Sequence, residues 1–332
     1  MRRHYGFADV TIGERLEGGF ANDVFRVGAD GAEYVLRVKH PPVDREDVAW
    51  EHRLLALLSE RLDEVQAPLA GRDGRTSFAW EDRAAWLLPF VAGAPADAGR
   101  AADRLASAAS LGRLHRAAGE LDVGPRPRIA PLRRLAWPPL LVPLELWDHR
   151  AEIVKARTWA TRLVAEIAAT RSPPETLVHG DCFPGNVLVA GGRVTGLVDW
   201  EEAHIDWATW DLATAMWSFC HRGDELDRER APAFVAAYRA AGGTAREADD
   251  DLLLPLVRVK RVLEVLRART DREPLWTSSA RTCARSRTSR RGPDRLAPWR
   301  SRLSPPRTTS PPSSPPSPTS AAARTARRCA GS

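Results

Sequence analysis

The chain has 332 residues, 43% of them hydrophobic, and four cysteines, so it can bury a sizeable core but has too few cysteines for a disulfide framework. Residues 277–332 hold twelve Arg, no Lys and one acid, a net charge of +11, so the formal +6 leaves −5 for residues 1–276. No segment has the roughly 20 apolar residues of a membrane span, so we expect a cytoplasmic protein without a membrane partner.

The first part of the chain carries strand patterns. Segment 15–27 has two glycines and an Asn-Asp pair before a β-type run, which predicts a hairpin with a glycine-containing turn. The next segment alternates, with apolar residues on one face and Arg37 and Lys39 on the other. A further strand is predicted over 85–90, followed by a connector rich in Gly and Pro.

A helix is predicted over residues 46–62, because apolar residues recur there with helical spacing. Glu51 falls on this apolar face. An unpaired carboxylate would be costly in such a place, so Glu51 predicts a cationic partner.

From about residue 100 the pattern turns helical, with helices predicted over 101–121, near 145–170 and through most of 206–270. His115 lies on an apolar stripe, which favours a core histidine over a ligand. Four tryptophans are interpreted mainly as core residues of this part: Trp200, Trp207, Trp210 and Trp217.

Two short strands, 177–178 and 187–189, flank the loop sequence HGDCFPGN. Asp181 follows the first strand and Asn186 comes five residues later. An Ala-Gly-Gly-Arg turn then predicts a hairpin to a strand that ends at Asp199. We therefore expect these three side chains to converge at one end of a small sheet.

These three residue types suit phosphoryl transfer to an alcohol. A carboxylate such as Asp181 can accept the hydroxyl proton, and the oxygens of Asn186 and Asp199 suit a hard cation. The alternative for the single residues is structural, with Asp181 capping a turn and Asn186 in a left-handed turn position. The three residues together, in this order, favour a catalytic role over a structural one.

The last 56 residues contain nine Pro and few large apolar side chains, which predicts a disordered low-complexity tail. Nucleic acid is not an expected partner of the acidic body, and only this basic tail would be a candidate for binding it. Another hypothesis is that the tail is the out-of-frame translation of a GC-rich gene.

The sequence HGDCFPGN, followed by LVDWEEAHIDWATWDLA, resembles the superfamily of aminoglycoside phosphotransferases, choline kinases and homoserine kinases. The resemblance covers roughly residues 10–270. It implies an α+β, two-lobed, protein-kinase-like fold with a small antiparallel sheet in the N-terminal lobe and a larger, mainly helical C-terminal lobe. The expected parts are a nucleotide-binding lobe over 1–92, a catalytic and substrate lobe over 93–276, and the tail over 277–332.

The resemblance also implies roles for the motif residues. Asp181 would be the catalytic base, Asn186 and Asp199 would bind Mg²⁺, and His179 would support the loop. Family members often have His where this chain has Phe183, so the chain departs from the family pattern at this position. Cys182 is interpreted as a packed cysteine rather than a nucleophile.

The resemblance places an ATP site on the first lobe. Arg37 matches the lysine of the family, with Lys39 as the second choice and Glu51 as the partner, although an ordinary structural ion pair is the alternative. Four further residues would contact the nucleotide, two in a phosphate loop and two in the hinge between the lobes: Gly18, Gly19, Pro89 and Val91.

The expected reaction transfers the γ-phosphate of ATP to a hydroxyl group of a small molecule. An aminoglycoside-type acceptor is the main hypothesis, because the acidic body suits a cationic substrate. The alternatives are a homoserine kinase, in which Lys260 or Arg261 would bind the substrate carboxylate, a choline-like amino-alcohol kinase, and a pseudokinase that only binds nucleotide. The absence of an A-P-E segment argues against a protein kinase.

Overall fold

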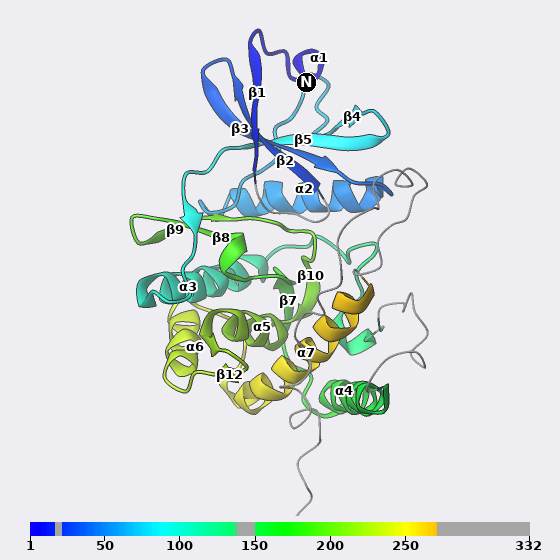
Figure 1. The fold of residues 1–332 in the computed structure, drawn as a ribbon, viewed down its shortest axis with the longest axis vertical. Coiled ribbons are helices and arrows are strands. Elements are labelled where there is room, and N and C mark those ends of the chain that lie inside the picture. Colours follow the sequence, from blue (N-terminus) through cyan, green and yellow to red (C-terminus); the bar gives the residue numbers. More distant parts are fainter. Residues whose placement is uncertain (17–21, 136, 138–149, 271–332) are drawn as a thin grey trace, which may run out of the picture. The chain divides into compact units, whose positions relative to one another are not determined.

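The computed structural model describes residues 1–16, 22–135, 137 and 150–270 (Figure 1). Its N-terminal part holds a five-stranded antiparallel sheet in the order β1-β2-β3-β5-β4. The elements of this part are α1 (Arg2–Tyr5), β1 (Val10–Arg15), β2 (Asn22–Ala29), β3 (Ala32–Lys39), α2 (Arg45–Ser59), β4 (Phe78–Trp80) and β5 (Arg83–Pro89).

Strand β3 lies at the centre of this sheet and has the two faces that its alternation predicts. Leu36 and Val38 are buried in an apolar cluster with residues of β2 and β5. Arg37 and Lys39 lie on the opposite face. The strand thus directs two cationic side chains away from this apolar cluster.

Helix α2 begins at Arg45, where the Asp44 side chain accepts hydrogen bonds from the backbone N–H groups of Glu46 and Asp47. The expected apolar face is confirmed, and it buries Glu51 to 2% exposure among leucines. The helix ends three residues earlier than expected, at Ser59.

The second part is mainly helical. Its helices are α3 (Ala101–Ala118), α4 (Arg150–Thr170), α5 (Ala208–Cys220), α6 (Arg230–Ala240) and α7 (Leu253–Thr270), with 3-10 turns at Leu132–Arg134, Pro184–Asn186 and Glu247–Leu252. Its short strands are β6 (Ala94–Pro95), β7 (Glu175–Val178), β8 (Val187–Ala190), β9 (Arg193–Leu197), β10 (His204–Trp207), β11 (His221–Arg222) and β12 (Glu225–Leu226). This α+β arrangement confirms the expected fold class.

The two strands that flank the HGDCFPGN loop belong to different sheets, which corrects the expectation of one small sheet. Strand β7 pairs with β10, whereas β8 pairs with β9 and β6. The predicted hairpin between β8 and β9 is confirmed, and Gly191 and Gly192 form its turn with φ of 57° and 74°.

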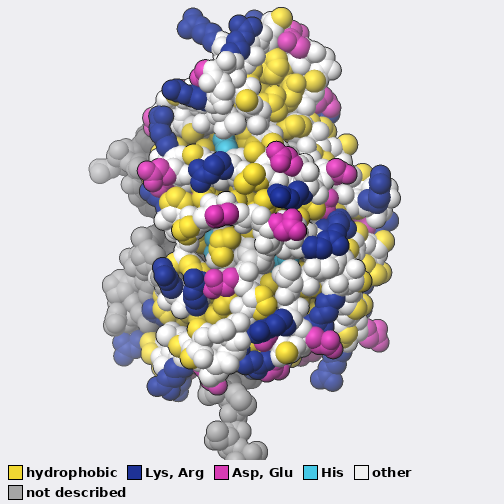
Figure 2. All heavy atoms as spheres, turned by 180° about the vertical axis from the view of Figure 1, so that it is seen from behind, with side chains coloured by type: hydrophobic (Ala, Val, Ile, Leu, Met, Phe, Trp, Pro, Cys, Tyr) yellow, Lys and Arg dark blue, Asp and Glu magenta, His cyan; other side chains and the backbone are white. Residues whose placement is uncertain are grey.

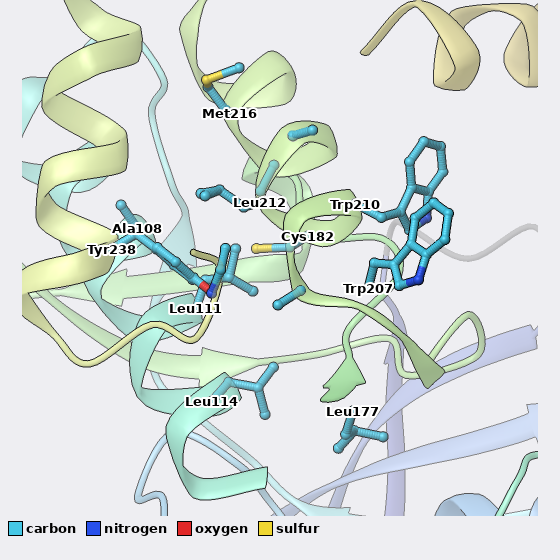
Figure 3. Packing of buried hydrophobic residues seen from close by; sticks show 14 of the residues in the cluster. Ala108, Leu111, Leu114, Leu177, Cys182, Trp207, Trp210, Leu212, Met216 and Tyr238 are labelled. Atoms are coloured by element: carbon cyan, nitrogen blue, oxygen red, sulfur yellow. The ribbon is translucent and has the colours of Figure 1, made fainter. Parts of the chain in front are cut away.

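The larger apolar cluster of the described residues joins α2, the helices α3 to α7 and several of the short strands. Figure 3 shows a part of it, with labelled residues of α3, α5 and α6. All four of the tryptophans predicted for the core are buried in it. On the face drawn in Figure 2, basic and acidic side chains are interspersed over the described residues. None of the described helices is long and apolar enough to cross a membrane.

Candidate active site

Asp211, in the first turn of α5, anchors the loop that follows β7. Its carboxylate accepts hydrogen bonds from the backbone N–H groups of His179 (2.8 Å) and Gly180 (3.1 Å). Burial disfavours the charged carboxylate, but the hydrogen bond from His115, the histidine charges and the backbone donors outweigh it and lower the pKa of Asp211. An ionised Asp211 therefore fixes the backbone that leads into Asp181.

His115 is the core histidine that its apolar stripe predicts. Its ring is fully buried, with Nδ1 2.8 Å from the Tyr238 hydroxyl and Nε2 3.1 Å from Asp211. The Tyr238 oxygen also accepts the backbone N–H of Ala245 at 2.9 Å, so His115 joins Tyr238 and Asp211 in one buried hydrogen-bond network.

Gly180 allows the loop to pass close to the segment before β10. Its φ is 79°, and a Cβ atom at this position would lie 2.2 Å from the carbonyl oxygen of Glu202. Only glycine fits both the left-handed conformation and the close backbone contact. The glycine of the motif therefore has a steric role directly before Asp181.

Asp181 and Asn186 are joined across the loop. The Asn186 side chain donates through Nδ2 to the backbone oxygen of Asp181 (3.0 Å) and to its carboxylate (3.1 Å). Asn186 lies in a 3-10 turn and does not adopt the left-handed conformation of the structural alternative. Because its nitrogen is used in these contacts, the oxygen of its amide is the atom left to bind a cation.

Asp199 returns beside this loop as the hairpin predicts. Strand β9 ends at Leu197, two residues before the expected end at Asp199, and the backbone N–H of the next residue, Val198, donates to the Asn186 carbonyl at 3.0 Å. Asp199 itself has a φ of 65°, an uncommon conformation for a residue other than glycine. The three polar residues that the sequence singled out thus lie in neighbouring loops.

Asp181 has an altered acidity. Burial raises its pKa, and the negative charges of Asp199 and Glu202 add to the increase. The charges of Lys260, on α7, and His179 act in the opposite direction. Together these effects raise the pKa of Asp181, so it binds a proton more readily than an ordinary aspartate does.

Arg37 reaches from β3 to both expected partners. Its Nη2 donates to the Asp199 carboxylate at 3.0 Å, and its Nη1 lies 4.0 Å from Glu51. Burial opposes the charged guanidinium, but these carboxylates and Glu201 outweigh it and raise the pKa of Arg37. Arg37 therefore links the sheet, α2 and the residue expected to bind metal.

Lys39 has a different partner from Arg37. Its Nζ lies 3.0 Å from Glu201, which also accepts a hydrogen bond from the side chain of the buried Asn22. Sequence reasoning did not connect Glu201 or Asn22 to this network, although Glu201 lies within the segment LVDWEEAHIDWATWDLA and Asn22 within the predicted hairpin.

Of the four other residues predicted for the nucleotide site, the structure describes two. Pro89 ends β5 opposite Tyr34, and Val91 follows in the connector that passes β9. Gly18 and Gly19 lie outside the described residues. The contacts of these four residues with a nucleotide stay predictions.

His179 and Cys182 both lie in the interior. The His179 ring is fully buried and packs on Trp200 with 4.6 Å between ring centroids. Cys182 is 3% exposed and lies among apolar residues such as Leu212 and Trp207 (Figure 3). Burial raises the pKa of the Cys182 thiol well above its usual range, which argues against a thiolate nucleophile. Phe183, next to it, is 39% exposed.

Arg126 was missed by the sequence reasoning. It lies in the Pro-rich passage after α3, where no periodic pattern predicts burial, yet it is only 4% exposed. It bonds to two acids of α2, Asp47 and Glu51. Its position near other charged residues becomes apparent only in the fold.

Comparison with known proteins identifies one family over most of the chain. The model of the phosphotransferase enzyme family matches residues 12–252. The homoserine kinase of Gluconobacter oxydans is 30% identical over 238 residues, which cover 70% of this chain and 72% of that protein. The homoserine kinase of Methylocella silvestris is 27% identical over 241 residues, covering 71% and 73% of the two chains.

Two solved structures have a similar fold. An amicoumacin kinase in complex with AMP-PNP and Ca²⁺ aligns with a TM-score of 0.66 and 17% identity, over 84% of this chain and 86% of that one. A microcompartment-associated aminopropanol kinase aligns with a TM-score of 0.64 and 20% identity, over 79% and 85%. With its family model, its relatives and its kinase-like fold in agreement, this small-molecule phosphotransferase belongs to the phosphotransferase enzyme family.

Proposed function

We propose that this protein transfers the γ-phosphoryl group of ATP to the hydroxyl of a small amino alcohol, and that homoserine is the first acceptor to test. The observation that carries the proposal is the grouping of Asp181, Asn186 and Asp199 around one loop, with Arg37 bonded to Asp199. This set supplies a proton acceptor, two oxygen ligands and a phosphate-binding cation.

The residues present fit a divalent cation held together with a nucleotide. Among the described residues, no group of three His, Cys, Asp or Glu side chains could hold a metal by itself. Asn186 and Asp199 would supply two oxygen ligands, a number that suits Mg²⁺ completed by phosphate oxygens and water. Bound there, Mg²⁺ would neutralise charge on the phosphate oxygens. The Ca²⁺ and AMP-PNP of the amicoumacin kinase complex support this pairing by analogy.

Asp181 would then act on the acceptor. Its carboxylate would take up the hydroxyl proton while the Asn186 amide holds its orientation. Burial raises the pKa of Asp181, which strengthens it as a base provided that it stays ionised at working pH. Arg37, as a planar fork, would hold phosphate oxygens from the side of the sheet.

The choice of an amino alcohol rests on the relatives. Homoserine kinases match about 70% of the chain, and the aminopropanol kinase shares the fold. They support the amino-alcohol alternative better than the aminoglycoside-type acceptor that the acidic body suggested. Lys260, whose charge acts on Asp181, is a candidate to bind the carboxylate of homoserine.

The test is an acceptor screen with the full chain, ATP and Mg²⁺. Phosphorylated product would be followed by ³¹P NMR with homoserine, aminopropanol, choline and an aminoglycoside. We expect turnover with one of the first three compounds and loss of turnover in Asp181→Ala, with ATP affinity kept. ATP binding without turnover on any acceptor would favour the pseudokinase, and turnover by Asp181→Ala would contradict the role of Asp181.

A further inference from the structure

Arg126 uses every hydrogen-bond donor of its guanidinium inside the protein. Nε and Nη2 donate to the two oxygens of Asp47, each at 2.7 Å, and Nη2 also donates to Glu51 at 3.0 Å. On the other edge, Nη1 donates to the backbone oxygens of Trp200 (2.7 Å) and Ala203 (3.1 Å). These five contacts match the five N–H groups of an arginine.

The contacts of Arg126 join two elements that are far apart in the sequence. Asp47 and Glu51 belong to α2, beside the five-stranded sheet, whereas residues 200–203 form the segment between Asp199 and β10. The guanidinium also lies over the ring of Trp50, 5.1 Å from its centroid. A single buried side chain thus holds α2 against the segment that starts at the expected metal ligand.

The same arginine sets the direction of the Glu51 carboxylate. Arg126 takes Oε2 of Glu51, while Oε1 is buried without a hydrogen-bond partner among the described residues and lies 4.0 Å from Arg37. Arg37 in turn donates to Asp199 at 3.0 Å. Arg126 is therefore linked to Asp199 in two ways. One link runs through Glu51 and Arg37, and the other runs through the backbone of Trp200, the residue after Asp199.

Charge balance argues that a cation is required at this place. Two buried carboxylates of α2 face Arg126, and two partly buried carboxylates, Asp199 and Glu201, already share Arg37. Burial opposes the charge of Arg126, but Asp47 and Glu51 outweigh this effect and raise its pKa. A lysine would keep the charge but could not bond to Asp47 on one edge and to two carbonyls on the other.

We propose that Arg126 is a positioning residue for phosphoryl transfer: it fixes Glu51, and through it Arg37, relative to the segment that begins at Asp199. The inference rests on the proposed function for its catalytic consequence. Its structural part, that Arg126 shapes the nucleotide and metal site, is independent of which acceptor is used.

The experiment compares Arg126→Lys with a matched control, Arg246→Lys, in the full chain. Arg246 also forms a fork with a buried aspartate, Asp249, but touches no residue of the site. Melting temperature, ATP affinity measured without acceptor, and kcat and KM for the acceptor would be determined for both variants below their melting transitions.

We expect Arg126→Lys to lower kcat and ATP affinity by about tenfold or more while the KM for the acceptor stays within about twofold. Arg246→Lys should lose thermal stability without these changes. If Arg126→Lys behaves like Arg246→Lys, the residue is only structural and the proposal is wrong. Because ATP affinity needs no acceptor, the inference can hold even if no acceptor is phosphorylated.

A second variant covers the case in which Arg126→Lys does not fold. Asp47→Asn keeps the arginine and its contacts with Glu51 and the two carbonyls, but weakens its charged fork. It should lower kcat and ATP affinity in the same direction by a smaller factor. Unchanged kinetics and ATP affinity in a folded Asp47→Asn protein would overturn the proposal.

Discussion

The Asp211 carboxylate accepts the backbone N–H of His179 at 2.8 Å, so a residue on α5 fixes the loop that carries Asp181. The second oxygen of the same carboxylate accepts the N–H of Gly180 at 3.1 Å. His115 from α3 holds the carboxylate from another direction, and Tyr238 from α6 holds His115. Three helices therefore position one short loop through a continuous set of hydrogen bonds.

Asp211→Asn should destabilise the protein by about 2–4 kcal/mol, because the amide replaces one acceptor oxygen by a donor that faces an N–H group. Urea unfolding followed by tryptophan fluorescence would measure this loss. Asp251→Asn, which removes an exposed carboxylate paired with Arg171, should change stability little and serves as the control. Equal stability of the two variants would contradict an anchoring role for Asp211.

The rate of phosphoryl transfer should have an acid limb governed by Asp181. The base must be ionised, and its pKa lies above the ordinary 3.8, so kcat/KM should fall as pH decreases through that raised value. Lys260→Met removes a charge that lowers this pKa, so the limb should move to higher pH. Lys155→Met, at an exposed position of α4, should leave the limb in place.

An unchanged acid limb in Lys260→Met would show that Lys260 does not act on the titrating group. A limb that persists in Asp181→Asn with residual activity would assign the titration to another residue. Each result is obtained from the same pH profile of kcat/KM.

Stability should also depend on pH through His52 of α2. This buried ring contacts Thr76 at 2.7 Å, and burial together with the charges of Arg37 and Lys39 lowers its pKa from 6.5 to about 4. The unfolded chain then binds the proton first, so the contribution is complete above about pH 6.5 and is lost as pH falls towards 4.

The loss attributable to His52 would approach about 3 kcal/mol at the acid end of this range. Urea unfolding at pH 7 and pH 5 would show it as a fall in the free energy of unfolding. In His52→Gln this fall should be smaller, because glutamine does not titrate. An equal fall in both proteins would exclude His52 as its source.

Asn186→Ala should raise the Mg²⁺ concentration needed for half-maximal activity by about tenfold, because it removes one of two expected oxygen ligands. It also removes the two hydrogen bonds to Asp181, so kcat should fall. Asn186→Asp keeps an oxygen ligand and should retain the metal requirement more closely. A lowered kcat with unchanged Mg²⁺ dependence in Asn186→Ala would limit this residue to orienting Asp181.

The contiguous parts of the site could be predicted from the sequence. Asp181 and Asn186 share one loop, and the Gly-Gly turn predicts that Asp199 returns beside them. Strand alternation likewise placed Arg37 away from the core, and helical period placed Glu51 on a buried face where it needs a cation. These predictions succeed because backbone periodicity and turn chemistry act over short distances.

The contacts made across long sequence separations could not be predicted. Arg126 meets α2 and residues 200–203 from an irregular Pro-rich passage, which has no period from which burial follows. The pairing of β7 with β10 was missed for a related reason, since two strands of four residues carry no signal for their partner. Tertiary packing alone decides both.

Gly180 has a steric role that can be separated from the cost of its backbone conformation. Gly180 and Gly192 both have positive φ, 79° and 74°, but a Cβ at Gly180 would lie 2.2 Å from a carbonyl oxygen, while a Cβ at Gly192 would meet nothing within 4 Å. Gly192→Ala should therefore cost about 1 kcal/mol, and Gly180→Ala about 3 kcal/mol. Since Gly180 precedes Asp181, its variant should also lose most of kcat, whereas Gly192→Ala should keep it. Equal losses of stability would mean that the loop can move away from Glu202, and Asp181 would then be less rigidly held than its hydrogen bonds to Asn186 imply.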